Sequence, residues 1–181
     1  MKLKLKKLIS EFYDDSGITI QSIEEIRDIL LNHTDVAFRT SMGYYIATYK
    51  IKELQADVIS AMCRYENKGY LSTLIYASYQ FECSKYFKVY IAIMLESTFH
   101  SSLESYIAIR KCKNISVEEL SVAKKALEYW CYFHDVAELS DSEVISKKEL
   151  ITEIITYLKG RIKRMNAKLN NGKSWIKSCN R

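Results

Sequence analysis

The sequence predicts an all-α fold, a single-domain irregular bundle of five to seven helices. Its 181 residues contain no proline and only five glycines, whereas proline usually makes up about 5% of residues. Because proline interrupts the hydrogen-bond ladder of a helix, its absence permits long helical stretches. Three Ser-x-x-Glu sequences are typical of helix starts, and apolar residues follow each of them at helical spacing.

The length and composition are those of one globular domain. Hydrophobic residues make up 48% of the chain and charged residues 27%, which excludes a disordered protein. We predict a helical domain over residues 1–172 and a basic C-terminal tail over residues 173–181. No internal repeat of the tetratricopeptide type is recognisable at a period of about 34 residues.

The first half of the chain contains three predicted helical stretches. Ser22-x-x-Glu25 predicts a helix start, and the apolar spacing after it indicates a helix over residues 23–32. A second helix is expected over residues 44–67, with Gly69 ending it. Residues 71–111 are expected to be helical with two breaks, one near Cys83 and one near residues 100–102.

Two further helices are predicted in the second half. Ser116-x-x-Glu119 precedes a helix expected over residues 117–139. Ser146-x-x-Glu149 predicts a last helix over residues 147–170, which Gly172 is expected to end.

The sequence favours a cytoplasmic protein. The longest uncharged apolar run, residues 89–95, is far shorter than the about 20 residues of a membrane-spanning helix. The lysine-rich residues 1–9 lack the apolar segment of a signal peptide. The odd number of cysteines and the absence of C-x-x-C indicate reduced thiols; the five are Cys63, Cys83, Cys112, Cys131 and Cys179.

Enzyme signatures are absent from the sequence. It contains no phosphate-binding glycine loop and no G-x-S-x-G sequence, so we predict no catalytic residue and no cofactor. Cys131 and His134 could form half of a zinc site, but no second pair has suitable spacing. A hydrogen-bonded core histidine explains His134 better, and no metal site is predicted.

Basic residues are concentrated at the two ends of the chain, around an acidic middle. Residues 1–10 carry four lysines and no acid, and no acidic residue follows Glu153. Basic residues flank the apolar stripe of the last helix, which suits contact with phosphates. The predicted nucleic-acid-binding residues are Lys159, Arg161, Lys163, Arg164, Lys168, Lys173 and Lys177. A core helix with a solvated basic face, a helix on an anionic membrane and a helix in a partner's groove are alternative interpretations.

Nine of the fourteen tyrosines lie between Tyr44 and Tyr90. Tyrosine is enriched at protein interfaces, although it also packs at core edges with its hydroxyl in water. The residues predicted to form a protein-binding surface are Tyr44, Tyr45, Tyr49, Tyr76, Tyr79 and Tyr86.

These patterns support three functional hypotheses. The first is a non-enzymatic regulatory protein that binds nucleic acid through its basic terminal segments. The second is a helical adaptor, inhibitor or chaperone-like protein that binds a protein partner through the tyrosine-rich surface. An AT-rich composition (abundant Ile, Lys and Tyr) would suit a viral or mobile-element gene. The third hypothesis is an enzyme whose dispersed site joins two of His33, His100 and His134 with a carboxylate. Basic ends that meet in space favour the first hypothesis, and ends that lie apart favour the second.

Overall fold

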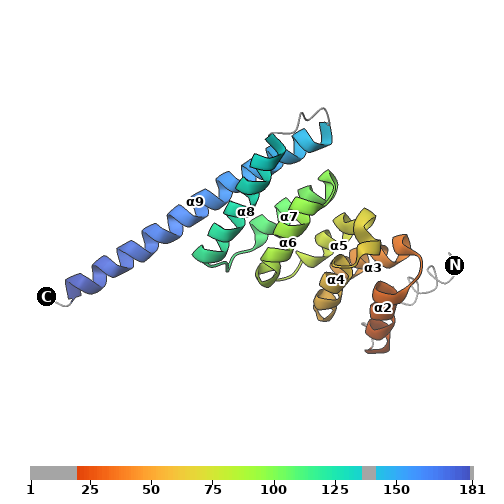
Figure 1. The fold of residues 1–181 in the computed structure, drawn as a ribbon. Helices are drawn as coiled ribbons and strands as arrows, with labels where there is room; N and C mark the ends of the chain where they lie inside the picture. Colours follow the sequence, from red (N-terminus) through yellow and green to blue (C-terminus); the bar gives the residue numbers. More distant parts are fainter. Residues whose placement is uncertain (1–19, 136–141, 180–181) are drawn as a thin grey trace.

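The computed structural model describes residues 20–135 and 142–179 (Figure 1). The described residues form eight α-helices, three short 310 helices and no strand. The predicted all-α class is confirmed, and the number of helices exceeds the expected range by one. The α-helices are α2 (Ile20–Asn32), α3 (Val36–Thr48), α4 (Gln55–Met62), α5 (Leu71–Ser78), α6 (Phe87–Glu96), α7 (Phe99–Lys111), α8 (Val117–Asp135) and α9 (Ser142–Cys179). The 310 helices are η1 (Lys52–Leu54), η2 (Tyr65–Tyr70) and η3 (Ser84–Tyr86).

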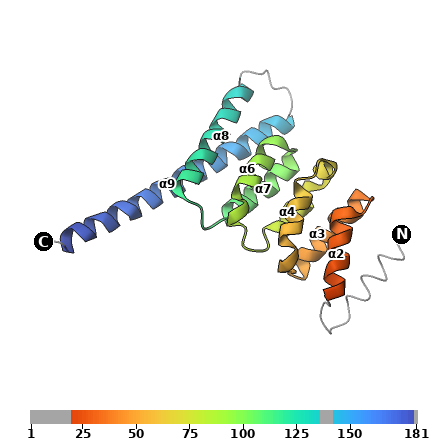
Figure 2. The same ribbon diagram turned by 60° about the horizontal axis from the view of Figure 1, so that its bottom comes forward.

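Consecutive helices pair into four hairpins that are stacked in a row (Figures 1 and 2). One layer of the row contains α3, α5, α7 and α9, and each of these helices packs on the next. The other layer contains α2, α4, α6 and α8, and it is open between α4 and α6. This arrangement resembles that of α-solenoids, in which each hairpin contacts only its neighbours.

A single hydrophobic cluster runs through the row between the two layers. The largest fully buried side chains come from six of the eight described α-helices and from the 310 helix η1. They are Ile26, Leu30, Ile46, Leu54, Leu74, Ile75, Phe87, Tyr90, Met94, Ile109, Leu120 and Leu127. Helix α9 adds Ile151, Ile154 and Leu158, each fully buried. Because no hairpin can bury its apolar face alone, the stacking of neighbours supplies the core.

The predicted single helix over residues 44–67 is wrong, because the chain turns after α3. Lys50 adopts a left-handed conformation with φ 54°. The N–H of Ile51 donates to the carbonyl of Ile46 at 3.0 Å, and that of Lys50 to Ala47 at 3.3 Å. This is the Schellman pattern that ends many helices, usually with glycine at the left-handed position. Gly69 lies within η2 and does not end an α-helix.

One of the three predicted capping sequences forms as expected. The Ser116 hydroxyl accepts a hydrogen bond from the Glu119 N–H at 3.1 Å, and the Glu119 carboxylate accepts from the Ser116 N–H at 3.1 Å. The other two predictions are wrong, since α2 begins at Ile20 and α9 begins at Ser142, both before the expected serine. Helix α9 also continues past Gly172 to Cys179.

The two breaks expected in residues 71–111 are confirmed. The chain leaves α5 after Ser78 and passes Cys83 before η3 and α6. Ser97 and Thr98 then separate α6 from α7, two residues before His100. In the described part of the chain, no helix is long and apolar enough to cross a membrane.

Candidate functional site: the groove between α4 and α6

Two of the predicted nucleic-acid-binding residues make structural contacts within the protein. The guanidinium of Arg161 donates to the carbonyl oxygens of Cys112 at 2.6 Å and Lys113 at 2.7 Å. Lys159 forms an ion pair with Glu128 of α8, with 3.2 Å between Nζ and Oε1. These contacts hold α9 against the end of α7 and against α8.

The remaining basic residues lie farther along α9, which extends beyond the other helices (Figures 1 and 2). Lys163, Arg164 and Lys168 are exposed. Lys173 and Lys177 belong to the same helix, but their side chains lie outside the described part. Leu169, an apolar residue of this part of α9, is 57% exposed.

The two basic ends of the sequence are not shown to meet. Residues 1–10 lie outside the described residues. The first described helix, α2, is at the opposite end of the row from α9 (Figures 1 and 2). The described residues of the predicted basic surface therefore all lie on α9, at one end of the row (Figure 1).

The predicted tyrosine surface is only partly a surface. Tyr44 and Tyr49 are 60% and 40% exposed, while Tyr45, Tyr76 and Tyr86 are half-buried. Tyr79 is buried, and its hydroxyl donates to Glu104 of α7 at 2.7 Å. Burial and this carboxylate raise the pKa of Tyr79. The expectation that Tyr79 is available to a partner is therefore wrong: its hydroxyl joins α5 to α7.

Aromatic side chains of α8 are more exposed than most of these tyrosines, and the sequence pattern did not single them out. Tyr129, Tyr132 and Phe133 are 65%, 66% and 52% exposed, and Val122 on the same helix is 61% exposed. The Tyr129 and Phe133 ring centroids are 4.4 Å apart. All four residues lie on α8, which belongs to the last described hairpin of the row.

Cys131 and His134 share α8, and His134 is engaged within the helix. Its Nδ1 lies 2.8 Å from the carbonyl oxygen of Trp130, and the two rings stack at 3.8 Å between centroids. The described residues include no group of three or more His, Cys, Asp or Glu side chains placed to hold a metal ion. His33, His100 and His134 belong to different hairpins of the row.

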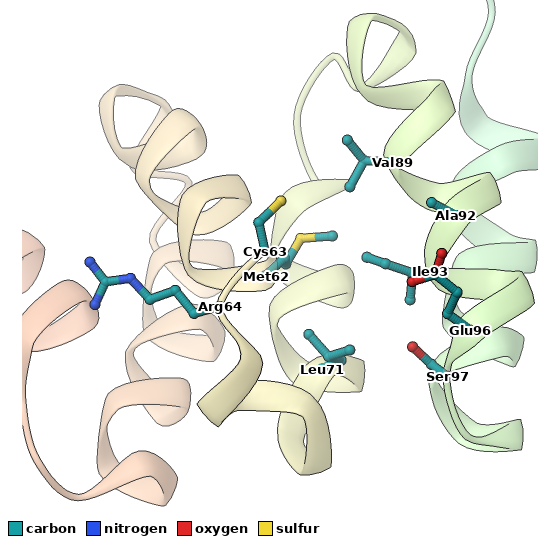
Figure 3. A pocket seen from close by; sticks show the side chains of 9 residues that line it. All are labelled: Met62, Cys63, Arg64, Leu71, Val89, Ala92, Ile93, Glu96 and Ser97. Atoms are coloured by element: carbon teal, nitrogen blue, oxygen red, sulfur yellow. The ribbon is translucent and has the colours of Figure 1, made fainter.

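A groove of about 540 Å³ lies between α4 and α6 (Figure 3). Met62 and Cys63 come from the end of α4, and Leu71 comes from the start of α5. The residues from α6 and the turn after it are Val89, Ala92, Ile93, Glu96 and Ser97. Met62 and Ile93 point toward each other across the groove (Figure 3).

On both sides of this groove, ion pairs link neighbouring helices of the layer formed by α2, α4, α6 and α8. Arg27 of α2 binds Asp57 of α4, with 3.1 Å between the paired atoms. Lys88 of α6 reaches Glu119 of α8 at 3.9 Å. We find no ion pair between α4 and α6 in the described part of the chain. These two helices are held in one structure through α5 and α7, which pack on each other directly.

The polar residues of the groove lie at its edges. Arg64 points away from it, and its guanidinium donates to the carbonyl oxygen of Leu31 instead (Figure 3). Cys63 is an exposed free thiol at the mouth. Glu96 is exposed where α6 ends. The groove therefore has an apolar wall and floor with a carboxylate at one end.

Sequence reasoning missed the groove, although one signal for it was present. Residues 89–95 form an apolar run over almost two helical turns, so α6 is apolar on more than one face. A helix that is apolar on more than one face usually packs against neighbours on several sides. No protein-family model, curated protein or solved structure matches this chain. The groove geometry is therefore the basis for the proposed function.

Proposed function

We propose that this protein is a non-enzymatic helical adaptor that binds an amphipathic helix of a partner protein, in the cytoplasm, through the groove between α4 and α6. The observation that supports this proposal is the open apolar groove itself. Elsewhere in the layer formed by α2, α4, α6 and α8, neighbouring helices pack on each other: α2 on α4, and α6 on α8. A partner helix laid between α4 and α6 would complete that layer.

The lining of α6 has the spacing of a helix-packing surface. Val89, Ala92, Ile93 and Glu96 occupy positions i, i+3, i+4 and i+7 of α6, which form one face about 10 Å long. Amphipathic helices bind to such grooves through apolar residues at the same spacing. A volume of about 540 Å³ accommodates several apolar side chains, while the partner's backbone would lie outside it.

The negative charge of Glu96 indicates which polar residues the partner helix should carry. Glu96 is exposed at the end of the groove, and the middle of the sequence is acidic overall. A basic residue beside the apolar stripe of the partner helix would face this carboxylate. The expected partner segment therefore has apolar residues at i, i+3, i+4 and i+7, with Lys or Arg at one end.

A designed peptide can test this proposal directly. The probe is a fluorescent amphipathic helix with leucines at that spacing and lysine on its polar face, titrated with the full chain and followed by fluorescence anisotropy. Ala92→Glu places a charge on the exposed apolar wall, so we expect binding at least about tenfold weaker. Val122→Glu makes the same kind of change on α8 and should leave binding unchanged.

The thiol of Cys63 provides a second measurement. Because Cys63 lies at the mouth of the groove, a bound helix should slow its alkylation, measured by peptide mapping with mass spectrometry. Equal loss of peptide binding in the two variants, loss in Val122→Glu alone, or unchanged alkylation of Cys63 would contradict the proposal.

Nucleic-acid binding by a regulatory protein is a second candidate function. Lys163, Arg164 and Lys168 are exposed on the part of α9 that extends from the row, and no acid follows Glu153. Binding of the full chain to duplex DNA or RNA at ~50 mM salt should then be steeply salt-dependent. The triple alanine variant of these residues should reduce the log–log slope by about three. No binding at this salt concentration would exclude this candidate.

A further inference from the structure

Two buried cysteines from distant parts of the sequence are in contact. Cys83 lies in the connection between α5 and α6, and Cys112 caps the end of α7. Their sulfur atoms are 3.6 Å apart, and the side chains are 2% and 1% exposed. The nearby turn is fixed by Ser84, whose hydroxyl accepts hydrogen bonds from the N–H groups of Lys113 at 3.0 Å and Asn114 at 3.1 Å.

The two thiols are not equivalent. The hydrogen bond between the two thiols lowers the pKa of Cys83, and burial partly opposes this effect. The same hydrogen bond, together with burial, raises the pKa of Cys112. Cys83 is therefore the better nucleophile of the two, because the thiolate is the reactive form.

A small oxidant has a route to Cys83. This residue lines a cavity of about 450 Å³, together with Tyr79, Phe81, Glu82, Lys111, Lys113 and Asn114. Glu82 and Lys111 are exposed, so the cavity lies at the surface. Hydrogen peroxide is little larger than water and fits easily in this volume.

We propose that Cys83 and Cys112 are a reversible oxidation site, which forms a disulfide when hydrogen peroxide reaches the cavity beside Cys83. The Cys83 thiolate attacks one peroxide oxygen; an S–O bond forms, the O–O bond breaks, and the departing hydroxide takes up a proton to become water. The Cys112 sulfur then attacks the Cys83 sulfenic acid. An S–S bond forms, the S–O bond breaks, and a second water leaves with the Cys112 proton. The two thiols lose two electrons in total, and one peroxide gains them.

The geometry requires only a small movement. The sulfur atoms must approach from 3.6 Å to about 2.05 Å, which side-chain rotation and a slight shift of the α5–α6 connection would supply. The disulfide would join this connection to the end of α7. This inference is independent of the proposed adaptor function.

The test uses the full chain as it is. The reduced protein is treated with one equivalent of hydrogen peroxide, free thiols are alkylated, and the cysteines are mapped by non-reducing mass spectrometry. We expect a peptide that links Cys83 to Cys112, a mass lower by two hydrogen atoms, and recovery of both thiols with dithiothreitol. Oxidation of the exposed Cys63 alone, or a link that involves any other cysteine, would overturn the proposal.

Variants in which one cysteine is replaced by serine separate the two chemical steps. Cys112→Ser should leave a sulfenic acid on Cys83 that dimedone traps, since the resolving thiol is absent. Cys131→Ser, on α8 and outside the pair, should still form the disulfide. The assignment of roles is wrong if dimedone labels Cys112 in the Cys83→Ser variant but does not label Cys83 in Cys112→Ser.

Discussion

Arg161 of α9 caps the end of α7, where its guanidinium donates to the carbonyl oxygen of Cys112 at 2.6 Å and also to that of Lys113. Lys147, earlier in the same helix, does the same for α6: its Nζ donates to the carbonyls of Leu95 at 2.9 Å and Ser97 at 2.6 Å. Cations are favourable at these positions because the last carbonyls of a helix lack partners and carry partial negative charge. One helix thus fixes the ends of both helices in the preceding hairpin.

Replacing Arg161 should reduce stability. Arg161→Ala removes two charge-assisted hydrogen bonds and leaves carbonyls at the end of α7 without a donor, so we expect a loss of about 1.5 kcal/mol in the free energy of unfolding. Urea denaturation measures this value. Arg164→Ala, an exposed arginine on the same helix, should change stability by less than about 0.5 kcal/mol. Equal losses in the two variants would show that Arg161 does not act as a cap.

Replacing Lys147 should have a larger effect, because this side chain is buried at 8% exposure. Lys147→Met preserves the length of the side chain but removes its donors, and we expect a loss of about 2 kcal/mol. Lys163→Met is the matched control, since Lys163 is exposed on the same helix. Thermal and urea unfolding should give the same order of stability. A neutral Lys147→Met variant would contradict this interpretation.

Gly43 permits the close approach of α3 to α5. A Cβ atom at this position would lie 2.9 Å from Cδ2 of Leu74, which is fully buried. Gly43→Val should therefore separate the two helices and cost about 2 kcal/mol of stability. Gly69→Val is the control, because a Cβ there would have no neighbour within 4 Å. Comparable unfolding midpoints for the two variants would contradict the prediction.

The capping box of α8 should be lost in acid. Hydrogen bonds from the N–H and the hydroxyl of Ser116 lower the pKa of Glu119 below its ordinary value. Because the folded-state pKa is lower than that of the unfolded chain, the stabilisation is complete above the ordinary pKa of about 4.3 and is lost as pH falls through the folded-state pKa. Glu119→Gln should be less stable than the parent near neutral pH, with a difference that decreases below about pH 4. A difference independent of pH would contradict this origin.

Local signals in the sequence predicted those features that depend on nearby residues. The start of α8 is correct because Ser116 and Glu119 bond to each other within one helical turn. The end of α3 was missed because Lys50 takes a left-handed conformation that glycine usually adopts. That turn is stabilised by the burial of Ile46 and Ile51, which is a tertiary effect.

The candidate site was less predictable than the fold. The sequence identified basic and aromatic residues, but it could not distinguish the exposed Lys163 from Arg161, which serves as a cap. The same holds for the exposed Tyr44 and the buried Tyr79. These roles depend on which carbonyl or carboxylate lies opposite, and the opposite residue comes from a distant segment.

By itself, the sequence determined the all-α class, most helix positions and the uneven distribution of charge. These properties follow from proline content, apolar spacing and residue type, which are local or summed over the chain. Only the tertiary structure decided that the helices stack as hairpins, that α4 and α6 leave a groove, and that Cys83 meets Cys112. The physical reason is that packing joins residues far apart in the chain, and no local pattern records which of them will meet.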